Sequence, residues 1–143
     1  MSHAFLLPLK FQKQEPDKCA IAALSSVLNY LGVSYSGIDK IYSEEEKGTK
    51  LITLVNYANL YVNTDVQRVA YGEIAEHTIK GRPVIVMRKI GQRYHYYTVK
   101  GFVRNERKII VNDGYDENVL LRVAENGASQ DADIGIIFGS INQ

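Results

Sequence analysis

The chain has 143 residues, of which 45% are hydrophobic and 23% are charged, and its 17 basic and 16 acidic side chains give a net charge of +1. These proportions exclude a disordered or fibrous chain and predict one globular domain over residues 1–143, large enough to bury a core without disulfides. The balanced charge leaves no surplus of cations for a nucleic-acid backbone, so we expect no nucleic acid among its partners.

The single cysteine and the lack of a long apolar run indicate the compartment in which the protein is found. Cys19 can form no internal disulfide and no cysteine-rich zinc cluster, which is typical of a protein from a reducing compartment. The apolar run 4–7 is too short for a signal peptide, and no stretch reaches the about 18 apolar residues of a membrane helix. We therefore expect a cytoplasmic protein with no membrane span, metal or cofactor.

The strongest predicted helix begins after Asp17, which is suited to be its N-cap, and ends at Gly32, which can close a helix in the left-handed conformation. Its apolar residues recur at the spacing of a one-sided helix: Ile21, Leu24, Val27, Leu28 and Leu31. Cys19 therefore lies in the first turn.

Helical patterns continue through the first half of the chain. The expected elements are a weak helix over 38–45, an amphipathic helix over 51–60, a short strand over 65–70 and a short helix over 73–80. Gly81 and Pro83 end the last of these helices.

The second half is dominated by β-branched and aromatic runs. The expected strands are 83–87, 94–102, 108–111 and 134–138, whereas 113–133 is expected to be a loop with at most one helical turn. Helices followed by strands predict an α+β domain.

Cys19 is the first candidate for chemistry. A thiol in the first turn of a helix is exposed to the positive end of the helix dipole and to free N–H groups, which stabilise a thiolate. The alternative is that Cys19 is a small buried hydrophobic residue without chemistry.

A cysteine nucleophile requires an imidazole base, and the chain has three histidines. His3 lies near the terminus, and His77 lies in a polar helix where a solvated role is expected. His95 opens a predicted strand and shares its face with Tyr97 and Val99, which indicates the inward face of the sheet.

The turn after this strand predicts a partner for His95. Residues 103–105 suit a three-residue hairpin loop whose final asparagine adopts the left-handed conformation. Pairing Phe102 with Glu106 then places His95 directly opposite Asp113. A four-residue loop would offset the two side chains.

Acyl transfer also requires donors for a developing oxyanion. A side-chain amide just before the helix, together with the Cys19 main-chain N–H, could provide them. Gln12 and Gln14 are the candidates, and nothing physical in this stretch selects one over the other.

These residues resemble small papain-like cysteine peptidases, and the likeness is closest to bacteriocin-processing, double-glycine leader peptidases and to phytochelatin synthases. In that group a glutamine precedes a helix-starting cysteine, as it does in residues 11–24 and their continuation 27–32. The resemblance reaches from about residue 10 to Asp113, which follows His95 by 18 residues. The other matching stretches are 48–49 and 54–58 in the second helix, 82–86 in the strand before the histidine, and 94–99 around it.

The resemblance implies a papain-like α+β fold in which N-terminal helices, including the nucleophile helix, pack on an antiparallel sheet. It implies that Cys19 is the nucleophile, His95 the general base and Asp113 the acid that orients it. Gln14 becomes the preferred oxyanion donor, with Gln12 as the alternative.

Three positions depart from the family pattern. Ala20 replaces a glycine, Lys18 replaces an aspartate, and 112–114 (Asn-Asp-Gly) replaces Asp-Pro. Alanine is favourable in a helix, and a lysine beside a thiol is expected to favour the thiolate.

The expected function is therefore that of a cysteine peptidase or amidase that cleaves a peptide or protein substrate through an acyl-enzyme. Two alternatives stay open. One is a catalytically silent papain-like domain that binds peptides, and the other is a γ-glutamyl or acyl transferase with the same triad.

Overall fold

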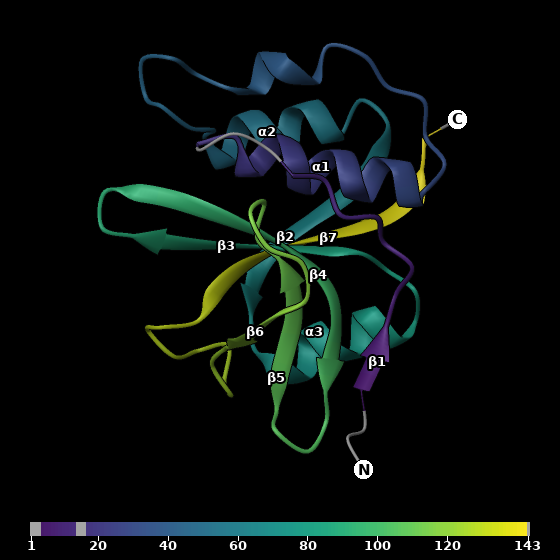
Figure 1. The fold of residues 1–143 in the computed structure, drawn as a ribbon, viewed down its shortest axis with the longest axis vertical. Helices are drawn as coiled ribbons and strands as arrows, with labels where there is room; N and C mark the ends of the chain where they lie inside the picture. The colour runs from purple at the N-terminus through teal and green to yellow at the C-terminus, as the bar shows by residue number, and fades with distance from the viewer. Residues whose placement is uncertain (1–3, 14–16, 143) are drawn as a thin grey trace.

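The computed structural model describes residues 4–13 and 17–142, and within them it contains three α-helices, one 3-10 turn and seven strands (Figure 1). The helices are α1 (Cys19–Tyr30), α2 (Leu51–Ala58) and α3 (Tyr71–Ile79), with the 3-10 turn η1 (Ile38–Ile41) before α2. The strands are β1 (Ala4–Leu6), β2 (Val62–Val69), β3 (Val84–Ile90), β4 (Arg93–Val103), β5 (Lys108–Asn112), β6 (Val119–Arg122) and β7 (Asp133–Ile141).

All seven strands form one antiparallel sheet. The strand order is β2-β7-β3-β4-β5-β6, and β1 pairs with β4 off this path. Helices α1 and α2 lie on one side of the sheet and α3 on the other (Figure 1). The expected α+β architecture, with N-terminal helices packed on an antiparallel sheet, is confirmed.

Two cores lie on the two faces of the sheet, because side chains alternate along each strand. On β4, Tyr96 packs into the core beneath α1, whereas Tyr97 and Val99 pack into the core beneath α3. His95 has the same parity as Tyr97, as the strand pattern predicts.

Helix α1 is more deeply buried than its pattern suggests. Every residue from Cys19 to Leu28 is buried, so the expectation of a one-sided amphipathic helix is wrong. The alanines and serines on its other faces are small enough for close packing, and buried Ser26 donates a hydrogen bond of 2.8 Å to the Lys10 carbonyl. Gly32, with φ of 74°, follows the helix as expected.

The helix also begins differently from the prediction. Its N-cap is Lys18 and makes no side-chain cap bond, so Asp17 is not the cap. Asp17 has a φ of 72° and pairs its carboxylate with Arg93, at the start of β4. Because its carboxylate pairs with Arg93, the Asp17 side chain does not cap α1.

Several boundaries differ from the predicted ones. Only the short turn η1 forms within 38–45, and α2 ends at Ala58 rather than at residue 60. Strands β1 and β6 were not predicted, because each is short and exposes alternate residues at the edge of the sheet. The 113–133 segment therefore contains a strand instead of a helical turn.

The predicted hairpin register between β4 and β5 is wrong. Val103 pairs with Lys108, so the loop has four residues, 104–107, and the left-handed residue is Arg107 with φ of 51°. The register then shifts at Lys100, whose carbonyl accepts a 2.7 Å hydrogen bond from the Leu7 N–H beyond β1. Strand β1 runs so close to β4 that a Cβ on Gly101 would lie 1.8 Å from a main-chain oxygen.

The shifted register changes which residues face each other near His95. The last pair is Thr98 with Asn112. Continued past the end of β5, this register brings Tyr115, and not Asp113, across from His95.

None of the helices described for this chain is long and apolar enough to cross a membrane.

Candidate active site

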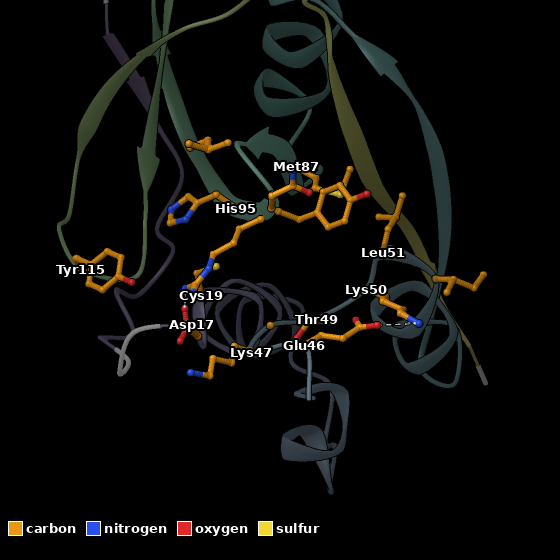
Figure 2. A pocket seen from close by; sticks show the side chains of 16 residues that line it. Asp17, Cys19, Glu46, Lys47, Thr49, Lys50, Leu51, Met87, His95 and Tyr115 are labelled. Carbon is orange, nitrogen blue, oxygen red and sulfur yellow. Dashed lines mark hydrogen bonds and ion pairs between the residues drawn. The ribbon is translucent and has the colours of Figure 1, made fainter. Parts of the chain in front are cut away.

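A pocket of about 850 Å³ lies where the start of α1 meets the β3–β4 hairpin and the segment that leads into α2. Cys19 and His95 both line it, together with Thr49, Met87 and Tyr115. In Figure 2, Cys19, His95 and Tyr115 lie at one side of the pocket, with Lys50 and Leu51 at the other. Two predicted site residues that are 76 positions apart in the sequence therefore share one cavity.

Cys19 is the first residue of α1, and its side chain is buried, with 8% of the residue exposed. Burial raises the pKa of the Cys19 thiol, and the charge of Asp17 acts in the same direction. The main-chain N–H groups of Tyr96 and Ala20 donate toward the sulfur and oppose this rise in pKa. The pKa of Cys19 is therefore raised, contrary to the expected effect of the helix end, because desolvation outweighs the helix end and the neighbouring donors.

Lys18, which was expected to favour the thiolate, lies over an aromatic ring. Its Nζ is 5.3 Å from the centroid of the Tyr42 ring. The thiol next to it remains protonated at neutral pH, since its pKa is raised.

His95 is half-buried and its ring lies near those of two tyrosines. Its ring centroid lies 4.5 Å from that of Tyr97, edge to face, and 6.3 Å from that of Tyr115, nearly parallel at 16°. Burial lowers the pKa of His95, whereas the charge and the main-chain carbonyl of Asp113 act to raise it. The imidazole is therefore neutral at pH 7, which is the form that can accept a proton.

Asp113 lies next to His95, but its carboxylate makes its hydrogen bonds elsewhere. Oδ1 accepts the N–H of Tyr115 at 2.9 Å and of Asp116 at 2.6 Å, and the Asp113 N–H donates to the Asp116 carbonyl at 3.1 Å. It is the main-chain carbonyl of Asp113 that accepts a hydrogen bond from the His95 ring. The carboxylate thus builds a turn, which the predicted register did not anticipate.

The same turn also contacts Cys19. Gly114 has a φ of 90°, and a Cβ at this position would lie 3.4 Å from the Cys19 Cβ. One turn therefore contacts both candidate catalytic residues. An Asp-Gly pair is a common turn signal, so the sequence contains a sign of this turn, but nothing in it indicates which residues the turn contacts.

Of the two candidate oxyanion donors, the structure describes only Gln12. Gln14 lies outside the described residues. Gln12 is half-buried and does not line the pocket that contains Cys19.

The fold, with α-helices packed on an antiparallel sheet, is shared with a solved peptidase domain. A solved structure, the peptidase domain of Streptococcus ComA, described as a bifunctional ABC transporter involved in a quorum sensing pathway, matches with a TM-score of 0.65 and 21% identity. The match covers 92% of this chain and 98% of that domain. A comparison with curated proteins finds no relative.

The model of the Peptidase_C39 like family matches residues 6–126, so the chain belongs to this family. The resemblance to papain-like, bacteriocin-processing peptidases is confirmed. Family membership supports a cysteine peptidase function and implies a peptide substrate.

Proposed function

We propose that the chain is a thiol peptidase in which Cys19 is the nucleophile, His95 the general base and Asp113 the residue that orients His95. The observation that carries the proposal is that Cys19, at the start of α1, and His95, near the start of β4, line the same pocket. A neutral thiol and a neutral imidazole in one pocket can act as a pair, because the base can take the proton as the sulfur attacks.

The reaction begins when the Cys19 sulfur attacks the carbonyl carbon of the peptide bond. The thiol proton passes to His95 as the new S–C bond forms. His95 then gives this proton to the leaving nitrogen as the C–N bond breaks, which leaves a thioester on Cys19. Water, deprotonated by His95, attacks the thioester and restores the thiol.

Charge develops on the carbonyl oxygen during the attack and requires hydrogen-bond donors. The Cys19 main-chain N–H, at the N-terminus of α1, is one donor in this proposal. The side-chain amide of Gln14 is the other, and Gln12 is the alternative.

A cleavage profile over many peptides tests the proposal for any peptide substrate. The protein would be incubated with a peptide library derived from a digested proteome, and the new peptide ends would be identified by mass spectrometry. We expect a defined set of cleavages in the wild type and their loss in Cys19→Ala, because no other side chain in the mechanism can form the thioester. His95→Ala should lower the rate by about 10²-fold or more.

His77→Ala is the matched control for the histidine variant. His77 lies on α3, outside the pocket, and contacts Arg82. Its cleavage profile should equal that of the wild type. Cleavages that persist in Cys19→Ala would contradict the proposal.

The burial of Cys19 and the raised pKa of its thiol favour one second candidate, a domain that binds peptides without cleaving them. In that case the library would bind and no cleavage would occur. Isothermal titration with retained library peptides would then give the same affinity for the wild type and Cys19→Ala.

A further inference from the structure

The loop after β5 is held in place by its own polar side chains. The Asp113 carboxylate accepts two main-chain N–H groups at the start of the loop. At its other end, Asn112 Oδ1 accepts the N–H of Asn118 at 3.0 Å, across six residues. The 113–118 loop therefore has a defined shape at both ends.

Tyr115 is the residue of this loop that faces His95. The two rings are nearly parallel, with a 16° interplanar angle and centroids 6.3 Å apart. Tyr115 also lines the pocket (Figure 2), and 41% of the residue is exposed. The Tyr115 ring therefore borders both the solvent and the imidazole.

We propose that Tyr115 is a positioning residue for His95: its ring, presented by the 113–118 loop, covers one face of the imidazole and holds it at the pocket beside Cys19. This inference rests on the proposed peptidase function. Tyr97, whose ring meets His95 edge to face, is buried in the core, so it is a fixed neighbour of the imidazole. Tyr115 is the neighbour that the loop supplies.

Covering the ring has an electrostatic consequence. Removal of the Tyr115 ring exposes His95 to water, which favours its charged form. The charged and titratable groups around His95 are Asp113 in the loop, Arg88 on β3 with its partner Asp133 on β7, Arg93 on β4 with its partner Asp17, Tyr97 on β4, and Cys19 on α1. All of them remain when Tyr115 is replaced, so the changed quantity is the solvation of the imidazole.

The first test is an NMR titration of the His95 ring in the wild type, Tyr115→Phe and Tyr115→Ala. The resonance that is missing in His95→Ala identifies His95. We expect the pKa of His95 to rise toward the ordinary value of about 6.5 in Tyr115→Ala and to stay at its lowered value in Tyr115→Phe, which keeps the ring.

Tyr94→Ala is the matched control for this titration. Tyr94 is 45% exposed and lines the same pocket, but it precedes His95 on the strand and points to the opposite face. The pKa of His95 should not change in this variant. An equal change in Tyr94→Ala and Tyr115→Ala would overturn the specific role of Tyr115.

The second test is the rate of cleavage of a peptide found in the library. Tyr115→Ala should lower kcat about tenfold. A misplaced base loses part of the rate enhancement of about 10²–10⁴-fold that a positioned general base supplies. KM should change less than kcat, and Tyr115→Phe should restore the rate. A Tyr115→Ala variant with the kcat of the wild type would overturn the inference.

The two tests separate the inference from the proposed function. A wild-type protein that cleaves nothing would contradict the peptidase function alone, and the titration would still decide whether Tyr115 covers His95. An unchanged titration in an active enzyme would contradict the role of Tyr115 alone.

Discussion

Cys19 and His95 have pKa values displaced in opposite directions by the same cause. Burial raises the pKa of the thiol and lowers that of the imidazole, so both groups are neutral around pH 7. In a buried position a neutral thiol and imidazole are favoured over a thiolate and an imidazolium, because burial removes the water that stabilises the two charges. At the scale of the residue, the sequence therefore predicted the two groups but not their charge, which depends on burial.

The lowered pKa of His95 sets the acid limit of the proposed activity. A base with a lowered pKa stays unprotonated to a lower pH, so kcat/KM should fall only below pH about 6.5. The measurement is the pH profile of kcat/KM on a cleaved library peptide. An acid limb above this pH would contradict a buried, neutral His95.

Asp113 allows a test of how the third residue acts. Its carboxylate caps the turn, and its main-chain carbonyl faces His95. Asp113→Asn keeps an oxygen acceptor at the same position and should retain most of kcat. Asp113→Ala removes the cap and should lower both kcat and the free energy of unfolding, the latter by about 1 kcal/mol.

Chemical denaturation and kinetics of the two Asp113 variants provide the measurement. If Asp113→Asn lost as much activity as Asp113→Ala, the carboxylate charge itself would be required. The role of the turn would then be wrong.

At the scale of the element, hydrophobic spacing predicted the existence of α1, α2, α3 and most of the strands. It did not predict the β4–β5 register, because the hairpin loop has four residues, 104–107, instead of three, and because the pairing shifts again at Lys100. The pairing of His95 with Asp113 was therefore derived from a wrong register. The two residues are nevertheless neighbours, because the loop after β5 turns back toward β4.

Gly114 is the element-scale test of the contact between this loop and α1. Its φ of 90° disfavours any side chain, and a Cβ would be in van der Waals contact with Cys19, 3.4 Å from its Cβ. Gly114→Ala should reduce the free energy of unfolding by about 1–2 kcal/mol or more. It should also lower the rate of cleavage.

Gly91→Ala separates backbone strain from contact in this test. Gly91 has a φ of 63° at the tip of the β3–β4 hairpin, and a Cβ there would meet nothing within 4 Å. It should lose stability through strain and keep the activity of the wild type. Equal activity in the two glycine variants would contradict the contact with Cys19.

At the scale of the whole molecule, the pocket combines a residue of α1, on one face of the sheet, with a residue of β4. Cys19 comes from the core beneath α1, whereas His95 shares its face of β4 with Tyr97, from the core beneath α3. The strand order and the loop after β5 bring the two together. The composition and the order of elements were sufficient to predict an α+β domain, but only the folded chain brings the Tyr115 and His95 rings to a centroid distance of 6.3 Å.

The central claim is that peptide cleavage passes through a thioester on Cys19. The most direct measurement is cleavage of a library peptide in the presence of hydroxylamine, with the N-terminal fragment identified by mass. A thioester intermediate predicts that part of this fragment appears as its hydroxamate in the wild type and that no fragment forms in Cys19→Ala. Cleavage that gives only the free acid, and that persists in Cys19→Ala, would contradict the account.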